Sequence, residues 1–400
     1  MSKKTAKHYD VIIIGAGPAG LSFARALAET DLSILLIEKL PKKVLANPPV
    51  DGRDIALTHL SEELMKDLGI WQNMPAEEIG KIKEAKVLNS DSPYSLHFDH
   101  HDTSKDTLGY IVSNHIIRKA VYDAVKEFSN IEIVPETEVT DLKTDERDAR
   151  VTLSDGTTLS APLVVAADSR FSNTRRKMGI SASMLDFGRV CIVCRMTHEG
   201  DHNNVAYECF HDDRTLAVLP LSEKTSSIVI TLSADEADSV MAMEEAAFNA
   251  DVQNRFENRL GRMKLAGEKH AYPLVAVYAR NFAATRFALI GDAAVGMHPV
   301  TAHGFNLGLR GAVTLAEEIK SALALGGDIG ALNLLKKYET KQNRAARPLY
   351  LGTNALVRLY TKNTRPARIL RGAMLRLGNN LPPVKRLIMN QLTEIQKLSA

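Results

Sequence analysis

The sequence predicts an α/β fold: a parallel sheet of βαβ units, interleaved with an α+β unit that has a largely antiparallel sheet, then a helical carboxy-terminal region. Three observations support this prediction. An apolar, β-branched segment at residues 9–14 leads directly into a glycine-rich turn and a helical pattern. Strand-like segments follow one another between residues 189 and 232. Apolar residues recur at helical spacing after Pro382.

The amino-terminal segment has the pattern of a strand–helix–strand unit. Residues 9–14 are typical of a buried parallel strand, 21–29 of a helix and 33–38 of a second strand. The turn between the first strand and the helix is Gly15-Ala16-Gly17-Pro18-Ala19-Gly20. This arrangement predicts a Rossmann-like unit rather than an isolated tight turn, because all of its parts occur in the required order.

Each glycine of this turn has a specific physical purpose. Gly15 permits the tight turn, Gly17 lets the backbone approach a pyrophosphate, and Gly20 allows close packing of helix and strand. Free N–H groups at the helix start then face the phosphates. Glu38 ends the second strand, where a carboxylate can accept hydrogen bonds from a ribose 2′-OH. The sequence therefore predicts a dinucleotide with a free 2′-OH, which is FAD or NAD rather than NADP.

Composition excludes several classes of protein. The 400 residues are 45% hydrophobic and 24% charged, with only three Cys, which excludes disordered, collagen-like and disulfide-stapled chains. No window has the roughly 18 uninterrupted apolar residues of a membrane span. The start of the chain lacks the apolar core of a signal peptide. We therefore expect a cytoplasmic protein, with attachment to the inner membrane surface as an additional expectation.

Further along the chain, three segments match what a flavoprotein requires. Asp51–Leu57 alone would be a charged loop. Two apolar strands end in carboxylates, Asp168 and Asp292. After the second of them, a turn-rich stretch leads into a helical pattern from Phe305 to about Leu325, whose amino terminus could face the pyrimidine edge of a flavin. Such a helix dipole would stabilise the anion of a reduced flavin.

In order and residue type, these motifs resemble the single-component FAD-dependent aromatic hydroxylases (flavoprotein monooxygenases), in particular their ubiquinone-biosynthesis branch. The resemblance spans nearly the whole chain. The matching segments are Gly15–Gly20, Asp51–Leu57, Leu108–Val112, Asp168–Arg175, Gly291–Ala294 and His298–Pro299 through Gly304–Leu309.

The resemblance implies an FAD site with a defined set of residues. They are Gly15, Ala16, Gly17, Ala19, Gly20, Glu38, Arg53, Asp168, Asp292, Pro299, Gly304, Phe305 and Asn306. Arg53 would lie along the FAD phosphates and ribose, and Asp292 would hold the ribityl chain. The Asp168 segment would lie near the pyrophosphate and the nicotinamide donor. The backbones of Gly304, Phe305 and Asn306 would touch the flavin ring edge.

The resemblance also implies the reaction. NAD(P)H would reduce FAD, and reduced FAD would trap O₂ as a C4a-hydroperoxide. An electron-rich phenol or hydroquinol ring would attack its distal oxygen, giving a hydroxylated polyprenyl phenol in ubiquinone biosynthesis. The flavin performs the chemistry, so the catalytic residue stays unknown. His303 and His298 are weak candidates for a base, and the alternative is that each only makes structural hydrogen bonds.

The chain departs from the usual family pattern at four places. Ser169 replaces a usual Gly, Val295 a usual His, and Gly311 a usual Asp. Thr301-Ala302-His303-Gly304 replaces Ala-Gly-Gln-Gly. We interpret these departures as marks of a divergent subgroup. An inactive enzyme and an altered reaction are the alternatives.

The predicted domains interleave along the chain. FAD-binding segments are expected at 1–80, 106–180 and 273–330. Segments of a substrate domain are expected at 81–105 and 181–272, and a basic helical region at 331–400. Within the substrate domain, Leu216–Leu221 and Ser226–Leu232 are predicted to pair, beside Arg189–Met196 and Val205–Phe210.

Two clusters could suggest a metal, and we predict none. Cys191, Cys194, His198 and His202 have zinc-like spacing, but residues three apart on a strand point to opposite faces. His97, His100 and His101 with Asp99 and Asp102 are typical of a solvated hairpin loop.

Charge is distributed unevenly. Residues 341–400 carry 12 Lys and Arg and a single acid, Glu394, whereas the rest carries 38 Lys and Arg against 47 Asp and Glu. The basic region could bind an anionic membrane surface or a complex of pathway enzymes, or its apolar helical face could simply dock on the protein body. Nucleic acid is disfavoured, because no recognition motif appears.

Two other functions remain open at this point. One is a different FAD oxidoreductase, such as a soluble-phenol hydroxylase or a prenyl reductase. The other is a non-catalytic FAD-bound scaffold subunit. The hydroxylated ring carbon, the choice between NADH and NADPH, and the oligomeric state do not follow from the sequence.

Overall fold

The computed structural model describes residues 7–89, 95–211, 213–298, 303–361 and 381–395. Its centre is a six-stranded sheet in which all neighbouring pairs are parallel except β19 with β20. The strand order is β19 (Ala283–Ala284), β20 (Phe287–Leu289), β13 (Leu163–Ala166), β2 (Val11–Ile14), β3 (Ile34–Ile37) and β9 (Ile131–Val134). The residues of β2, β3 and β13 are all buried, as expected of parallel strands with both faces covered.

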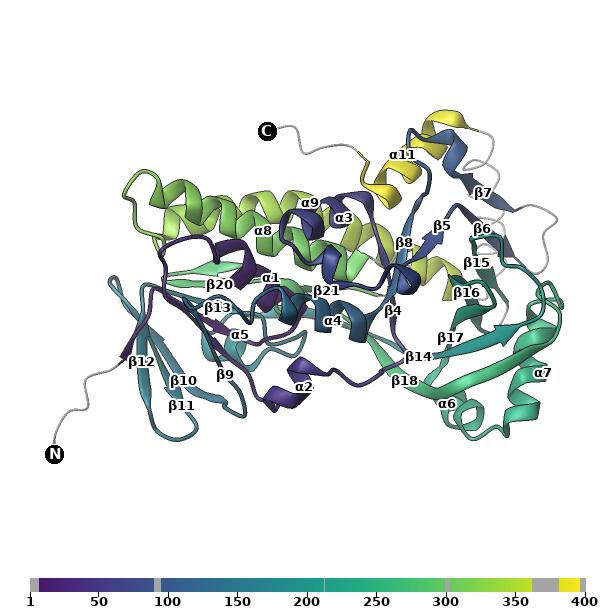
Figure 1. Ribbon diagram of the computed structural model, residues 1–400, viewed down its shortest axis with the longest axis horizontal. Helices are drawn as coiled ribbons and strands as arrows, with labels where there is room; N and C mark the ends of the chain where they lie inside the picture. Colours follow the sequence, from purple (N-terminus) through teal and green to yellow (C-terminus); the bar gives the residue numbers. More distant parts are fainter. Residues whose placement is uncertain (1–6, 90–94, 212, 299–302, 362–380, 396–400) are drawn as a thin grey trace.

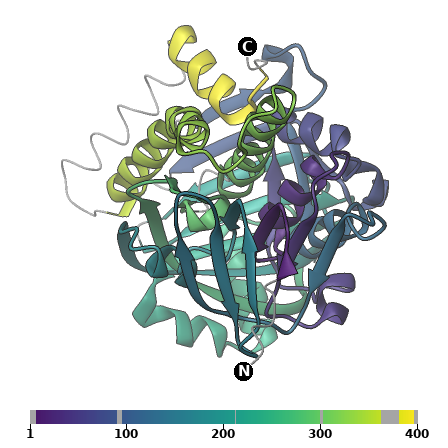
Figure 2. The ribbon, with the colours of Figure 1, turned by 90° about the vertical axis from the view of Figure 1, so that its left-hand side faces the viewer.

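Helices cover this sheet and hold the cofactor-binding elements in place. Helices α8 (His303–Leu323) and α9 (Leu332–Thr361) lie side by side over it, as Figures 1 and 2 show. α1 packs against α8. Gly308 of α8 faces the turn after β20, where a Cβ would lie 3.4 Å from Cα of Gly291 in ordinary contact. The smaller helices are α1 (Pro18–Leu27), α2 (Lys42–Ala46), α3 (His59–Asp67), α4 (Asn114–Asp123) and α5 (Asn173–Lys177).

A second, eight-stranded sheet forms the other half of the molecule. Its order is β21 (Val295–Gly296), β18 (Met263–Ala279), β14 (Ala182–His198), β17 (Thr225–Ser233), β16 (Thr215–Ser222), β15 (Val205–Phe210), β6 (Glu84–Asn89) and β7 (Leu96–Asp99). All neighbouring pairs are antiparallel except β15 with β6. The predicted α/β class with a largely antiparallel second sheet is therefore confirmed. β18 runs continuously past residue 272, and the domain boundaries stay a prediction.

The two faces of the eight-stranded sheet have different coverings. α6 (Ala234–Met241) and α7 (Glu245–Arg255) pack on one face, where Phe248 and Val252 are fully buried. A three-stranded sheet of β4 (Asp54–Leu57), β8 (Gly109–Ser113) and β5 (Gly80–Ile82) lies against the other. There a Cβ on Gly80 would clash with Pro220 O at 2.6 Å. A four-stranded sheet joins the far end of the molecule, with β1 (Lys7–His8), β12 (Thr158–Ala161), β11 (Ala149–Leu153) and β10 (Val139–Thr144).

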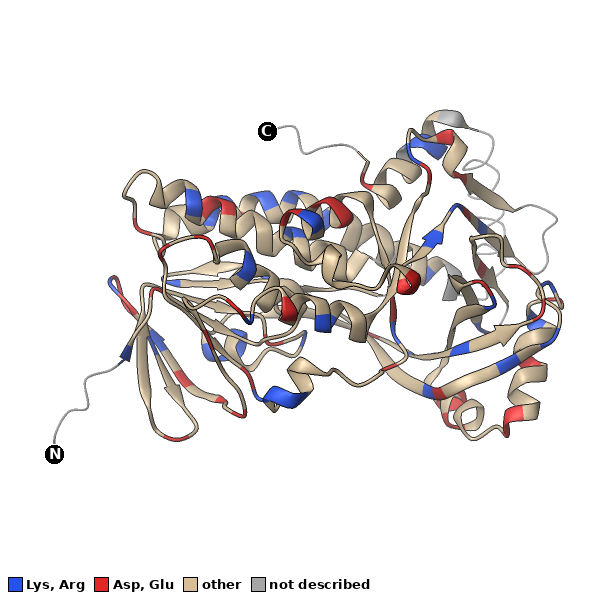
Figure 3. Cartoon of the chain, viewed as in Figure 1, with Lys and Arg blue, Asp and Glu red and all other residues tan. Residues whose placement is uncertain are grey.

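The expected carboxy-terminal helix is α11 (Pro382–Thr393), which begins at the predicted proline pair. Its Met389 is buried in a core shared with Ile111 and Phe98, so the helix docks on the protein body. Figure 3 shows basic residues on α11 and along α8 and α9. Lys362, Arg365, Arg368, Arg371 and Arg376 lie outside the described residues.

Candidate active site

The glycine-rich turn has the geometry that a pyrophosphate site requires. Gly15 has φ +107°, and a Cβ there would lie 2.5 Å from the carbonyl oxygen of Ala167. A Cβ on Gly20 would lie 2.0 Å from the carbonyl oxygen of Gly15. A Cβ on Gly17, in contrast, would meet nothing within 4 Å. Gly15 and Gly20 are thus required by packing, whereas Gly17 leaves open the side on which a phosphate can approach.

Glu38 lies directly beside this turn. Its Oε2 accepts a hydrogen bond from the Ala16 N–H at 2.7 Å, and its Oε1 accepts one from the Leu40 N–H at 2.9 Å. The carboxylate is therefore held at the carboxyl end of β3, at the edge of the turn. Each oxygen keeps a lone pair, so the predicted contact with a ribose 2′-OH fits this position.

Two arginines supply positive charge next to the turn. The predicted Arg53 is exposed, pairs with Asp51 at 2.6 Å and stacks on the Tyr272 ring at 5.3 Å. The second is Arg118 of α4, which the sequence reasoning missed. Burial lowers the pKa of Arg118, while the negative charges of Asp51 and Glu38 raise it in part. These two cations suit the diphosphate of FAD.

Asp292, which is predicted to hold the ribityl chain, has an ion-pair partner that the sequence did not reveal. Nη2 of Arg170 lies 3.0 Å from its Oδ2, and Nη1 of Arg170 donates to the carbonyl of Val275 at 3.1 Å. Arg170 therefore links Asp292 to β18 of the eight-stranded sheet and fixes the orientation of its carboxylate. Asp292 remains partly exposed, as a ligand of ribityl hydroxyls would be.

Asp168 has a local structural role that is visible without any ligand. It accepts hydrogen bonds from the Ser172 hydroxyl at 2.5 Å and the Thr174 hydroxyl at 2.8 Å, and so orders the turn into α5. Ser169, at the position where the family usually has Gly, has φ +84°. The backbone thus keeps the conformation of a glycine even though the side chain has changed.

The start of α8 is attached to the three-stranded sheet. The side chain of Asn306 accepts from the Thr58 N–H at 3.2 Å and donates to the Ala56 carbonyl at 2.9 Å. A Cβ on Gly304 would meet nothing within 4 Å, so the first turn of α8 offers open backbone for a ring edge, and Phe305 beside it packs on the main core. Pro299, with Thr301 and Ala302, lies outside the described residues.

The two weak base candidates are both buried and lie in different surroundings. The His298 ring packs edge-on against Phe187, with 4.9 Å between ring centroids. Burial, aided by Arg189 and Arg170, lowers the pKa of His298 to about 4, so it is neutral at pH 7. His303 opens α8, and its Nε2 lies 3.1 Å from the Gln391 carbonyl of α11. Both histidines therefore make structural contacts, and their roles in proton transfer stay a prediction.

Two family departures have a packing explanation. Val295 is buried in the main core and pairs with Tyr278 across β21 and β18. Gly311 leaves room for Gln342 of α9, since a Cβ there would lie 2.8 Å from Gln342 Nε2. That amide donates to the Leu307 carbonyl at 3.0 Å, which ties α9 to the start of α8.

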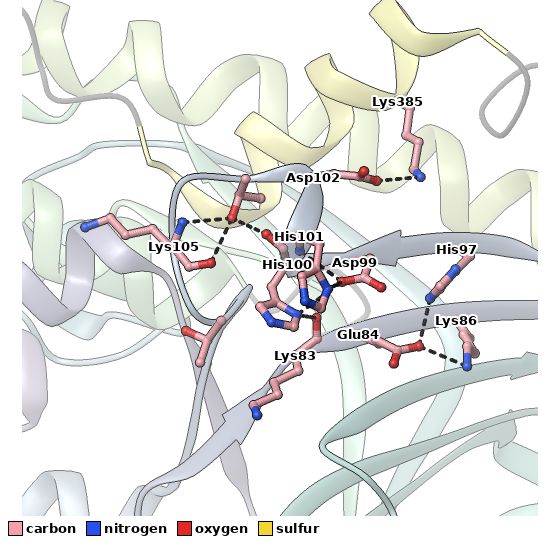
Figure 4. Close-up of polar contacts among 12 residues, drawn as sticks. Lys83, Glu84, Lys86, His97, Asp99, His100, His101, Asp102, Lys105 and Lys385 are labelled. Carbon is pink, nitrogen blue, oxygen red and sulfur yellow. Dashed lines mark hydrogen bonds and ion pairs between the residues drawn. The ribbon is translucent and has the colours of Figure 1, made fainter.

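The two clusters with metal-like residue types have different arrangements in the structure. Cys191 and Cys194 are buried on opposite faces of β14, so they cannot share one ion and the prediction of packed strand cysteines is confirmed. The hairpin cluster brings ligand atoms of Glu84, His97 and Asp99 within 4.8 Å of one another, as it does those of Asp99, His100 and His101. Figure 4 shows that hydrogen bonds and ion pairs link these groups, including Glu84 to Lys86 at 3.0 Å. These contacts account for the cluster as a hydrogen-bonded hairpin.

Comparisons with known proteins agree with this geometry. Residues 8–350 match the family model described as FAD binding domain. Ubiquinone hydroxylase UbiM of Neisseria meningitidis is 50% identical over 96% of this chain and 85% of its own length. Ubiquinone hydroxylase UbiL of Rhodospirillum rubrum is 34% identical over 97% of this chain and 90% of its own length. The crystal structure of p-nitrophenol 4-monooxygenase PnpA from Pseudomonas putida shares the fold, with TM-score 0.78, 16% identity, and coverage of 98% of this chain and all of that chain.

The glycine-rich turn, the two arginines and the start of α8 thus occur in a chain matched to an FAD-binding domain over most of its length. The chain belongs to the FAD binding domain family, in the group of FAD-dependent hydroxylases that includes the ubiquinone hydroxylases.

Proposed function

We propose that the protein hydroxylates the aromatic ring of a polyprenyl phenol or hydroquinol in ubiquinone biosynthesis, using NAD(P)H and O₂. The observation that carries this proposal is the 50% identity to a ubiquinone hydroxylase over 96% of the chain. The departures at Ser169 and Gly311 preserve the local backbone and packing, which supports an active enzyme over an inactive scaffold.

Bound FAD would supply the electron transfer from NAD(P)H and the activation of O₂. The chain's own residues would bind and orient it. Arg53 and Arg118 would neutralise the diphosphate, and Glu38 would accept a hydrogen bond from the ribose 2′-hydroxyl. Arg170 would hold Asp292 toward the ribityl chain, and the first turn of α8 would place N–H groups at the ring edge.

We place the prenylated aromatic ring at the face of the eight-stranded sheet opposite α6 and α7, part of which the three-stranded sheet covers. Two apolar clusters occupy it, one with Phe98 and Ile111, the other with Val193 and Leu274. Phe187 connects this face to His298, and the hydroxyl of Tyr272 donates to the carbonyl of Asp51 at 2.7 Å. The face therefore adjoins both loops that we assign to the flavin, and it can exclude water from the reacting ring.

A prenyl chain suggests contact with a lipid surface. Among the described helices, none is long and apolar enough to cross a membrane. Leu381 and Leu392 are exposed at the two ends of α11, and Arg386 is exposed on it. Such a helix can place leucines among lipid tails and arginine among anionic headgroups. Neutralising the basic residues of 351–400 should abolish co-sedimentation with anionic vesicles, whereas neutralising exposed lysines near Lys143 should not.

Genetic complementation tests the proposal. Strains blocked at single hydroxylation steps would receive this chain, and their quinone intermediates would be identified by mass. Restored ubiquinone in at least one strain is expected, and the strain identifies the ring position. If no strain is restored although the FAD-loaded protein is produced, the proposal is wrong and a scaffold role is favoured.

A further inference from the structure

One carboxylate lies on the largely apolar face of the eight-stranded sheet. Glu208 of β15 stands between Tyr207 and Cys209, which both pack into the cluster beneath α6 and α7. Because side chains alternate along a strand, Glu208 points to the opposite face. That is the face that adjoins the flavin-binding loops.

The strand register places Glu208 between two apolar clusters. Across the sheet, Val193 pairs with Val229, Val229 with Ala217, and Ala217 with Glu208. On its other side Glu208 pairs with Val87 of β6. Val193 and Val229 belong to the cluster that includes Phe187, whereas Val87 belongs to the cluster covered by Met389 of α11. Glu208 thus lies in the middle of the proposed substrate surface.

A carboxylate in such surroundings is costly unless it has a partner or a function. Burial raises the pKa of Glu208 to about 7, and a hydrogen bond from the Thr215 hydroxyl lowers it in part. A carboxyl group that titrates near neutral pH is well matched to accepting a proton at that pH.

Two cysteine thiols lie near Glu208, Cys191 on the same face of the sheet and Cys209 on the face beneath α6 and α7. Burial, together with the charge of Glu208, raises the pKa values of both thiols to about 12, so they stay neutral. Further charged or titratable groups include Arg195, His270 and Tyr272 on the sheet, and Asp54, His115 and His298 on elements opposite. Arg53 lies over the Tyr272 ring, and Arg170 and Arg189 act on His298. Arg195 is paired with Asp54 at 3.1 Å. Among the described groups, burial and Thr215 are the influences that set the pKa of Glu208.

We propose that Glu208 accepts the proton of the substrate's phenolic hydroxyl, a role that rests on the function proposed above. The phenol O–H bond breaks, the proton passes to a carboxylate oxygen of Glu208, and the electron pair stays on the phenol oxygen. The resulting phenolate is richer in electrons at its ortho and para carbons, which favours attack by those carbons on an electrophilic oxygen. After turnover the proton passes from Glu208 to water.

The first test measures substrate binding without turnover. The affinity of a prenylated phenol for the FAD-loaded enzyme is recorded without NAD(P)H between pH 5 and 9, from the change in flavin absorbance. In wild type and in the matched control Glu223→Gln, on the exposed turn after β16, affinity should rise as Glu208 ionises near pH 7, because the phenol O–H donates to the carboxylate. In Glu208→Gln, which keeps an acceptor for Thr215, this rise should be absent. Glu208→Asp should keep the rise at a shifted pH.

The second test measures turnover. Glu208→Gln should slow hydroxylation about 100-fold, and the deficit should shrink for a phenol of lower pKa, because that substrate ionises without help. If the affinity of Glu208→Gln for the phenol depends on pH as that of wild type does, or if the variant is equally slow with both phenols, the role of Glu208 is wrong.

These tests separate the two proposals. If phenol affinity shows the Glu208-dependent rise but wild type yields no hydroxylated product, the proposed function fails and the contact of Glu208 with the phenol stands. If wild type yields product but Glu208→Gln keeps the rise, the proposed function stands and the role of Glu208 is wrong. If wild type binds no phenol, both proposals fail.

Discussion

The hydroxyl of Thr58 donates a hydrogen bond of 2.8 Å to the carboxylate of Glu394, joining residues at opposite ends of the chain. Glu394 is the single acid of residues 341–400, and its other oxygen lies 3.4 Å from Arg310 of α8. Thr58 also caps α3 by accepting from the Ser61 N–H. This contact therefore anchors the carboxy-terminal helix over the start of α8, where we place the flavin ring edge.

Glu394→Gln should loosen α11. The variant loses a charge-assisted hydrogen bond and the attraction of Arg310, together worth about 2 kcal/mol in a partly buried site. Hydrogen exchange of residues 382–393 should become faster. Lys385→Gln, which breaks only the partly exposed pair with Asp102, is the control and should change exchange little. Equal exchange in Glu394→Gln and wild type would show that other contacts hold the helix.

Gly17→Ala should separate folding from FAD binding. The added methyl group meets no protein atom within 4 Å, so the thermal midpoint of the FAD-free protein should stay near that of wild type. The methyl group would occupy the side on which the diphosphate approaches, so the ratio of absorbance at about 450 nm to that of protein should fall. Gly15→Ala should instead destabilise the fold itself, because of its clash with Ala167. Full FAD content in Gly17→Ala would show that the glycine-rich turn does not contact the diphosphate.

Ser169→Gly should stabilise the protein. A side chain at φ +84° is strained, and glycine relieves that strain. Glycine also raises the entropy of the unfolded chain, so the net gain in the free energy of unfolding is about 1 kcal/mol. A higher thermal midpoint is expected. Ser154→Gly, on an exposed turn with ordinary φ, should lower the midpoint slightly. A midpoint that does not rise in Ser169→Gly would mean that contacts of the serine offset the strain.

His298 should make stability fall as the solution becomes acidic. Its folded-state pKa of about 4 lies below the usual value near 6.5, so the unfolded chain binds the proton first as pH falls. The contribution is present above pH 6.5 and declines toward pH 4, by about 2 kcal/mol at pH 5. His298→Gln should therefore show a smaller drop in thermal midpoint between pH 7 and pH 5. Identical drops in both proteins would mean that His298 is protonated in the folded state.

The parts of the site that were predictable are local in sequence. Gly15, Gly20 and Glu38 belong to one strand–helix–strand unit, so their spacing alone specifies their geometry. Arg118 and Arg170 were missed because the carboxylates near them, Asp51 and Glu38 for Arg118 and Asp292 for Arg170, are distant in sequence and meet them only in the folded chain. Glu208 alternates with apolar residues in a predicted strand, but alternation does not tell which face is covered by helices.

The contact of Glu394 with Thr58 was beyond sequence reasoning for a similar reason. The charge pattern marked the carboxy-terminal region as basic and left open whether its apolar face docks or binds a membrane. The structure shows that α11 docks on the protein body through Met389. Helical periodicity identifies the apolar face of the helix, but it does not identify the surface against which that face packs.

The most direct measurement of the central claim is oxygen labelling. The FAD-loaded protein would be incubated with NADH, a prenylated phenol and ¹⁸O₂, and the product analysed by mass. We predict a ring-hydroxylated product carrying one ¹⁸O atom, formed only when phenol, NADH and oxygen are all present. A product whose new oxygen comes from water, or oxidation of NADH that phenol does not accelerate and that yields no hydroxylated ring, would contradict the account.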